Sequence, residues 1–286
     1  MLTLTQAILL GFLQGISELF PISSLGHTVV VTGLLGWNVT HNDNNSYLIF
    51  LVTTHSATAL VLFAFYWKDW VRIVSGLVRS LREREIRATD PDAKLAWLLV
   101  VATIPAGMLG LLLEEPLRRQ FTVFRSAAFF LMVNGILLAL GETLRKKAVL
   151  ESRDSDGNRR IARLGWFQAV RVGLLQTLAL IPGFSRSGAT LAGSLWVGLS
   201  HEDALRFSFL LATPIIGAAA VLKLPDLLSP DARGAVGAAL VGATCSAVGA
   251  YLSVRFLTRY FQTKTLTPFA VYCFVAGLLA FAFLSR

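Results

Sequence analysis

Residues 14–28 have the sequence Gln-Gly-Ile-Ser-Glu-Leu-Phe-Pro-Ile-Ser-Ser-Leu-Gly-His-Thr, a polar cluster inside the apolar stretch Ala7–Leu35. Its proline and glycine predict a break in the helix. Broken backbone survives at membrane depth only where protein or a water-filled cavity surrounds it, and an ionisable side chain there is costly enough to indicate function. We therefore expect a broken membrane helix with Glu18 and His27 in a functional site. The plainer alternative is that these side chains only cap and pair the helix ends.

The chain as a whole is more apolar than a soluble core of its size can bury. Of its 286 residues 55% are hydrophobic and 15% are charged, and the mean hydropathy is +0.63. A membrane-spanning helix needs about 20 apolar residues. The stretches that meet this length are Tyr47–Trp67, Leu95–Leu113, Ser126–Leu144, Leu205–Leu224, Gly234–Phe256 and Leu266–Leu284. Two further apolar stretches, Ala7–Leu35 and Trp166–Leu199, are interrupted.

Basic residues are unevenly distributed along the chain. Residues 1–46 hold no Lys or Arg, whereas Lys68–Lys94 and Arg145–Arg163 hold seven each. Because cytoplasmic loops carry the excess of Lys and Arg, we expect both basic stretches inside the cell and the first segment outside. The net charge of +9 is then explained by loops that orient the chain, and no nucleic-acid partner is expected. With no basic residue before Lys68, the start of the chain does not resemble a cleaved signal peptide.

The two interrupted stretches are related by a shift of 162 positions. The shift aligns Gly11 with Gly173, Leu13 with Leu175, Gln14 with Gln176, Ser23 with Ser185, Gly26 with Gly188 and Thr28 with Thr190. The charge pattern requires each stretch to return to the side from which it enters, and an odd number of spans inverts the second copy. We predict an all-α integral membrane protein built of two inverted repeats, each a re-entrant helical hairpin plus three transmembrane helices.

These elements form one membrane domain over residues 1–286, with repeat one at about 1–144, a cytoplasmic linker at about 145–163 and repeat two at about 164–286. In the linker, Asp154–Asn158 has the sequence Asp-Ser-Asp-Gly-Asn, which is similar to part of a calcium loop but lacks the distal Glu, so a flexible turn is expected. Asp69–Arg87 has apolar residues at helical spacing among arginines and is expected to lie along the inner membrane surface.

Residues 181–190, Ile-Pro-Gly-Phe-Ser-Arg-Ser-Gly-Ala-Thr, form the break in the second stretch. The Pro-Gly pair stops a helix, and Ser-Arg-Ser-Gly then provides hydroxyls, amides and a guanidinium at a new helix N-terminus. Free amides and the helix dipole favour a phosphate there, and an arginine binds it with two hydrogen bonds. Arg186 needs a negative partner in this apolar stretch, either a substrate phosphate or Glu18. Both hold if the two side chains pair while the site is empty.

Together the two motifs, Gln14 to His27 and Pro182 to Thr190, resemble those of the undecaprenyl pyrophosphate phosphatase family, integral membrane enzymes linked to bacitracin resistance. The resemblance covers essentially the whole chain. It implies hydrolysis of undecaprenyl pyrophosphate to the monophosphate and inorganic phosphate, which recycles the lipid carrier for peptidoglycan and other envelope polymers. It also implies a bacterial plasma (inner) membrane protein whose site faces the outer, periplasmic side.

The resemblance assigns catalysis to Glu18, Ser24, His27 and Arg186, and phosphate binding to Gln14, Ser23, Ser185, Ser187 and Thr190. Arg186 and the hairpin amides can stabilise the negative charge on a phosphoryl group as it is transferred, and a histidine can donate or accept a proton. Ser24 either attacks the phosphorus or only positions water. A divalent cation, Mg²⁺ or Ca²⁺, is also implied. Because Gln14 stands where many members have Glu, Glu18 is the main expected ligand, Gln14 a weak one, and the substrate diphosphate supplies the rest.

Other functions and other roles for polar residues compete with this interpretation. Inverted repeats with broken helices are also typical of transporters, so a polyprenyl-phosphate transporter or flippase is the alternative function. A type 2 phosphatidic acid phosphatase is disfavoured because no second histidine closely follows Arg186. Thr54, His55, Asn134 and Thr213 either line the cavity or bond a neighbouring helix. The second role is favoured, and His55 is the first to test. Gly237, Gly242 and Gly249 are expected to allow close helix contacts and a homodimer among membrane lipids.

Overall fold

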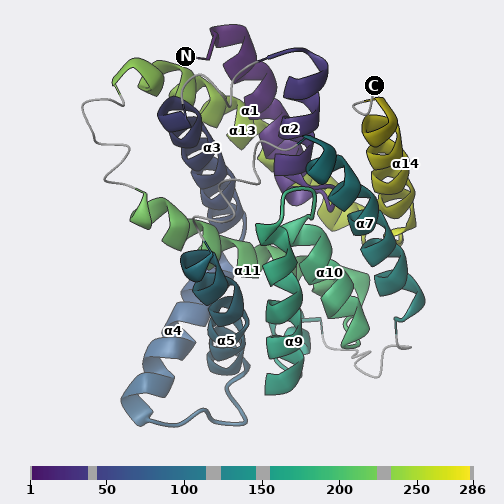
Figure 1. Ribbon diagram of the computed structural model, residues 1–286. Helices are drawn as coiled ribbons and strands as arrows, with labels where there is room; N and C mark the ends of the chain where they lie inside the picture. The colour runs from purple at the N-terminus through teal and green to yellow at the C-terminus, as the bar shows by residue number, and fades with distance from the viewer. Residues whose placement is uncertain (1, 38–43, 114–123, 146–154, 224–232, 284–286) are drawn as a thin grey trace.

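The computed structural model describes residues 2–37, 44–113, 124–145, 155–223 and 233–283. Every regular element within these ranges is a helix (Figure 1). In chain order the helices are α1 (Leu4–Leu19), α2 (Ser24–Leu34), α3 (Asn44–Phe65), α4 (Trp67–Glu83), α5 (Pro91–Leu112), α7 (Phe124–Thr143), α8 (Gly157–Ile161), α9 (Trp166–Gln176), the 3-10 helix η1 (Thr177–Leu180), α10 (Arg186–Trp196), α11 (His201–Leu222), α13 (Arg233–Tyr260) and α14 (Thr267–Phe283).

The six predicted spans correspond to α3, α5, α7, α11, α13 and α14. The first five of these are long and apolar enough to cross a bilayer. Helix α14 is equally apolar, but its described part has 17 residues and is shorter than the others. The prediction of an all-α integral membrane protein is confirmed, with Leu224 and Leu284 of the predicted spans outside the described residues.

Both interrupted stretches are helix, break, helix, as predicted. Helices α1 and α2 form the first pair, and α9 and α10, with η1 between them, form the second. Figure 1 shows the two pairs on opposite sides of the molecule, with their breaks facing each other near its middle. The break of one stretch therefore lies against the break of the other, which is what a shared site requires.

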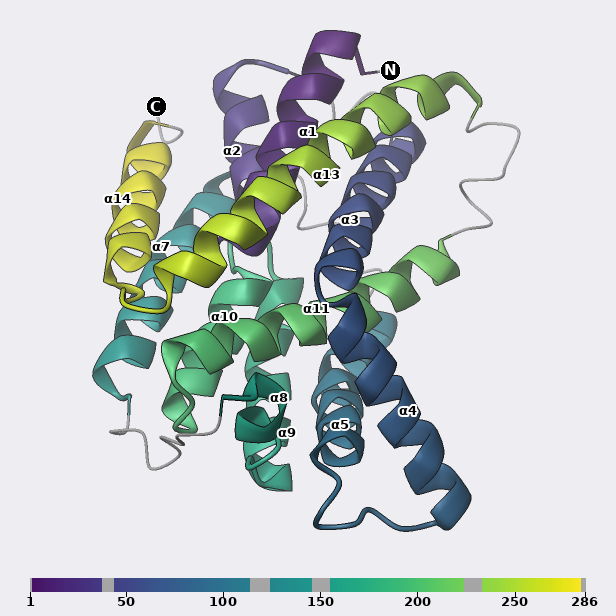
Figure 2. The same cartoon turned by 180° about the vertical axis from the view of Figure 1, so that it is seen from behind.

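Corresponding glycines of the two stretches make corresponding contacts. A Cβ added to Gly11 of α1 would collide with the backbone of Gly242 in α13, and one added to Gly173 of α9 would collide with the backbone of Ala102 in α5. Figure 2 shows α13 crossing α1. Each first hairpin helix thus packs on the middle span of the other half. The inverted relation of the halves stays a prediction, and these paired contacts support it.

Helix α4 has the amphipathic pattern that the sequence predicts. Its apolar side chains Ile73 and Leu77 pack into the core beside α5, while Val71 and Val74 are exposed. Asp90 caps the start of α5 through the amide of Ala93 and accepts from Arg79, and the guanidinium of Arg79 holds the pKa of that carboxyl below its usual value. This stabilisation is present above the ordinary pKa of an Asp and is lost as the pH falls through the lowered value. Its place at the inner membrane surface stays a prediction.

The expectation of a flexible turn at Asp154–Asn158 is wrong for its described residues. Asp156 begins α8 by accepting from the amide of Asn158, and it pairs with Arg72 of α4 at 2.6 Å. Asn158 is fully buried, donates to Asp69 of α4 and accepts from Arg206 of α11. Asp69 and Arg206 also pair at 2.6 Å. The linker therefore joins α4 of the first half to α11 of the second.

Two of the three α13 glycines that were predicted to allow close contacts contribute to packing within the chain. Gly242 lies against the ring of Phe50 in α3, and Gly249 lies against the backbone of α1. Gly237 has open space where a Cβ would be. The close helix contacts are thus confirmed at two positions, and the homodimer stays a prediction.

Replacement of Asn158 by alanine is expected to lower the free energy of unfolding by about 2 kcal/mol, because Asp69 and Arg206 each lose a hydrogen bond in a buried place. Thermal unfolding in detergent measures this change. The exposed amide of Gln262 offers the control, and Gln262→Ala is expected to be neutral. Equal stability of the two variants would show that Asn158 does not hold α4 and α11 together.

Candidate active site

The tips of the two hairpins meet through a buried ion pair. Arg186, the first residue of α10, places Nη2 3.2 Å and Nε 3.3 Å from Oε1 of Glu18, near the end of α1. The two side chains are only 12% and 7% exposed. Of the two partners that the sequence left open for Arg186, the structure shows Glu18. Since breaking a buried pair leaves an uncompensated charge, this contact holds the two halves together.

Three polar side chains contact the second carboxylate oxygen of Glu18. Oε2 accepts from Nε2 of Gln14 at 3.1 Å and from Oγ of Ser24 at 2.7 Å. Nε2 of His55, on α3, lies 3.3 Å from the same oxygen. Gln14 lies one turn before Glu18 on the same face of α1, as expected from their spacing. The hydroxyl proton of Ser24 therefore points at a carboxylate.

The two breaks differ in which position has a positive φ angle. In the second hairpin the left-handed conformation falls on Gly183, with φ at 105°, where it costs little. The corresponding residue of the first hairpin is Pro21, whose ring fixes φ near −65°. There the left-handed residue is Ser23, with φ at 69°. A non-glycine residue in that region stores roughly 1–3 kcal/mol of strain, and it directly precedes Ser24.

Hydroxyl groups at both breaks bind backbone. Ser23 accepts from the amide of Gly26, and Ser185 accepts from the amide of Gly188, so aligned serines cap α2 and α10 in the same way. Ser187 donates to the carbonyl of Phe20 at 3.0 Å. These bonds tie the second hairpin to the first and leave the helix starts side by side.

Thr190 lies one turn inside α10, and its hydroxyl bonds to groups outside the ion pair. Its hydroxyl is 2.6 Å from that of Ser208 on α11, and it also donates to the carbonyl of Arg186. The carbonyl of Ser208 in turn lies 3.5 Å from Nη1 of Arg186. Thr190 therefore supports the helix that carries Arg186, and a direct phosphate contact from it stays a prediction.

The hydrogen bonds of His27 go to residues other than Ser24 and Glu18. Its Nδ1 is 2.8 Å from the carbonyl of Ser23, and its Nε2 is 2.8 Å from the hydroxyl of Tyr272 on α14. The two rings are also stacked, with centroids 5.6 Å apart and planes 10° apart. His27 is thus held by its own hairpin and by the last helix of the chain.

Asn134 of α7 joins both breaks from the side. Its Nδ2 donates to the carbonyl of Pro21 at 3.1 Å, and its Oδ1 accepts from the amide of Ser185 at 3.0 Å. Both partners are backbone groups with no regular helical partner, so one amide side chain satisfies an acceptor and a donor that the breaks expose. The expectation that Asn134 bonds a neighbouring element is confirmed.

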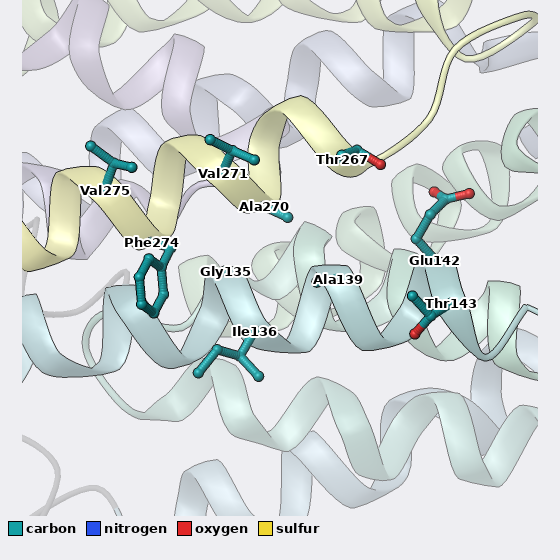
Figure 3. A pocket seen from close by; sticks show the side chains of 10 residues that line it. All are labelled: Gly135, Ile136, Ala139, Glu142, Thr143, Thr267, Ala270, Val271, Phe274 and Val275. Atoms are coloured by element: carbon teal, nitrogen blue, oxygen red, sulfur yellow. The ribbon is translucent and has the colours of Figure 1, made fainter.

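An apolar groove of about 330 Å³ lies between α7 and α14, and it is separate from this site. Figure 3 shows Glu142, Thr143 and Thr267 gathered at one end and Phe274 and Val275 toward the other. None of its lining residues is among the predicted site residues. The size of this groove therefore says nothing about the chemistry at the hairpin tips.

The comparisons with known proteins agree with the geometry. Residues 7–279 match the family model described as bacitracin resistance protein BacA. The chain belongs to the BacA family. Among its relatives are the undecaprenyl-diphosphatase of Mycolicibacterium paratuberculosis, 49% identical over 96% of this chain and 95% of that protein, and undecaprenyl-diphosphatase 2 of Frankia alni, 41% identical over 97% of each. That of Granulibacter bethesdensis is 44% identical over 98% of this chain and 96% of that protein.

Every predicted site residue of this BacA-family chain lies within the matched range, but two contacts escaped sequence reasoning. For His55 the bonding of a neighbouring helix was favoured over a place in the cavity, and it lies 3.3 Å from the site carboxylate. Tyr272 was not considered, because an aromatic residue in an apolar span usually packs without further role. The signal that pointed to His55 was an ionisable side chain within a span.

The oxygen atoms at Glu18 and Gln14 provide only part of the coordination that a hard cation needs. Among the described residues no three His, Cys, Asp or Glu side chains gather as a metal site. Oε1 of Gln14 is buried without a hydrogen-bond partner, beside a carboxylate, and such an oxygen suits Mg²⁺ or Ca²⁺. Two protein oxygens are too few for either ion, so a cation here needs further oxygens from a bound diphosphate or from water.

Asn134→Ala is expected to lower the free energy of unfolding by roughly 2–4 kcal/mol, since the carbonyl of Pro21 and the amide of Ser185 both lose a buried partner. Thermal unfolding in detergent measures the loss. Cys273→Ala serves as the control, because it removes only weak sulfur contacts, with the same amide at 3.4 Å and with the carbonyl of Pro21 at 3.7 Å. A loss no larger than that of the control would show that Asn134 does not hold the breaks.

Proposed function

We propose that this protein hydrolyses undecaprenyl diphosphate to undecaprenyl phosphate and inorganic phosphate, the activity that its relatives' names state. The observation that carries the proposal is the contact of Glu18 with both Ser24 and Arg186, because it unites a hydroxyl, its proton acceptor and an anion-binding group. Release of the monophosphate lipid returns the carrier for peptidoglycan and other envelope polymers, and this turnover underlies bacitracin resistance in the family.

Arg186 holds the diphosphate together with the start of α10. A guanidinium binds two phosphate oxygens at once, and the first amides of an 11-residue helix favour negative charge. In the structure the guanidinium is paired with Glu18, so a phosphate must take the place of the carboxylate on Arg186. This exchange keeps the arginine neutralised throughout and frees Glu18 beside Ser24.

Glu18 is the group positioned to take the proton of Ser24. Their oxygens are 2.7 Å apart, whereas the hydrogen bonds of His27 go to Ser23 and Tyr272. Ser24 then attacks the terminal phosphorus, giving a phosphoserine that water hydrolyses to inorganic phosphate in a second step, or it directs a water molecule to that phosphorus. In either case the bond from the phosphorus to the bridging oxygen breaks. His27 serves proton transfer at the phosphoryl group or the leaving phosphate once its Nε2 exchanges the hydroxyl of Tyr272 for a phosphate oxygen.

A divalent cation is part of the proposal. Glu18 and Oε1 of Gln14 would hold it with oxygens of the diphosphate, and the ion would neutralise charge on the group being transferred. The remaining hydroxyls, those of Ser23, Ser185 and Ser187, keep the two helix starts in place for the phosphate.

The proposed location is the bacterial plasma membrane, with the site open to the periplasmic side. The spans and the bacterial relatives support a multi-pass membrane protein, and the absence of basic residues before Lys68 supports an external first hairpin. A flippase activity is not favoured. Transport needs a binding site but no hydroxyl hydrogen-bonded to a carboxylate beside it.

Glu18→Ala, His27→Ala and Arg186→Ala are each expected to abolish phosphate release. His27→Ala is expected to fold as the wild type does, and the two variants that break the buried ion pair are expected to insert with a lower free energy of unfolding. The assay is phosphate release by the purified protein in detergent from a C55 polyprenyl diphosphate, with and without a chelator. We expect release only with the metal present. Wild-type turnover in all three variants would refute the site, and no release by folded wild-type protein would favour the transporter.

His55→Ala is expected to lower kcat about tenfold, because Oε2 of Glu18 loses one of its polar neighbours. His55→Gln keeps an N–H group in reach and is expected to retain more activity than the alanine variant. Thr53→Ala, on the same helix but bonded only to the carbonyl of Ile49, is the matched control. Activity of His55→Ala equal to that of this control would remove His55 from the site.

A further inference from the structure

Tyr272 contacts His27 and has no role in the chemistry proposed for the site. Its hydroxyl lies 2.8 Å from Nε2 of a histidine 245 positions earlier in the chain. His27 is 8% exposed, whereas Tyr272 is 46% exposed and lies on α14, at the edge of the molecule. Nε2 of the buried histidine is thus bonded to a half-exposed phenol.

The hydrogen bonds of His27 fix its tautomer. The carbonyl of Ser23 can only accept, so Nδ1 carries the proton in that bond. In the neutral ring Nε2 then has a lone pair, and the hydroxyl of Tyr272 donates to it. The basic nitrogen of His27 is thus determined, and Tyr272 holds its lone pair in one direction.

Stacking restrains the ring as well. The imidazole and the phenol are nearly parallel, with planes 10° apart and centroids 5.6 Å apart. Together with the two hydrogen bonds this contact limits rotation of the imidazole about its bond to Cβ. A proton-transfer group gains from such restraint, because its efficiency depends on holding the reacting geometry.

Helix α14 is itself placed by α7, which also carries Asn134. A Cβ on Gly135 would collide with the backbone of Ala270, and one on Gly277 would collide with the backbone of Met132, so the two helices are in close contact. Asn134 binds both hairpin breaks from α7. The position of Tyr272 relative to His27 is therefore set by the same helix that aligns the breaks.

We propose that Tyr272 is a positioning residue for the phosphatase reaction, which acts through His27 by fixing the direction of its Nε2 lone pair. This inference rests on the proposed function of the site. It predicts that the phenol hydroxyl contributes to kcat and contributes little to substrate binding or to stability.

Tyr272→Phe tests the proposal, because it keeps the stacked ring and removes only the hydroxyl. We expect kcat for the C55 polyprenyl diphosphate to fall about 10- to 100-fold, the usual scale of a hydrogen bond to an ionisable group, with KM within about twofold of wild type. The matched control is Tyr251→Phe, an exposed tyrosine on α13 that stacks with Arg255. It is expected to keep wild-type kcat and KM.

A spectroscopic readout separates positioning from a structural effect. In protein labelled with ¹⁵N-histidine, the signal missing from His27→Ala is that of His27. We expect its Nε2 resonance to shift in Tyr272→Phe, with the thermal midpoint unchanged, and to stay in place in Tyr251→Phe.

Unchanged kcat in Tyr272→Phe, a loss confined to KM, an equal loss in the control, or an unmoved His27 signal would each overturn the proposal. The wild-type enzyme serves as the reference for the function itself. If it releases phosphate while Tyr272→Phe behaves as wild type, only the positioning role fails. If it releases none, the proposed function fails first.

Discussion

The ion pair of Glu18 and Arg186 is the contact on which the rest of the structure depends. It joins residues of two helix breaks that are 168 positions apart, and both side chains are nearly buried. A charge in such a place needs its partner, so neither break is tolerable without the other. The same contact makes the site, because the carboxylate that neutralises Arg186 also accepts the hydrogen bond of Ser24. Stability and chemistry thus share one pair of side chains, and a phosphate that binds Arg186 changes both.

The surrounding helices hold this contact in place by satisfying what the breaks expose. Asn134 of α7 binds a carbonyl of one break and an amide of the other, and the hydroxyl of Ser187 reaches the carbonyl of Phe20 across the gap. At the far side of the protein, Asn158 ties α4 to α11. Irregular backbone whose exposed groups find partners in the protein can carry polar side chains within a membrane domain, as these breaks do.

Sequence reasoning predicted the features that depend on local pattern. The spans follow from apolar length, the breaks from Pro21 and Pro182–Gly183, and the pairing of Glu18 with Arg186 from the cost of an isolated charge. Sequence reasoning was wrong where contacts with residues distant in the chain determine the local structure. Asp156 and Asn158 have the composition of a surface turn, yet Asp156 pairs with Arg72, and Asn158 is fully buried between Asp69 and Arg206. Tyr272 could not be found, because nothing near it in the chain indicates that it meets His27.

The most direct test of the account is a cryo-EM structure with a methylene-bridged polyprenyl diphosphonate, which cannot be hydrolysed at the bridge. The account predicts phosphonate oxygens on the guanidinium of Arg186 and at the first amides of α10, with Glu18 displaced from the arginine and still beside Ser24. A headgroup bound away from the two hairpin tips, with the ion pair of Glu18 and Arg186 intact, would contradict it.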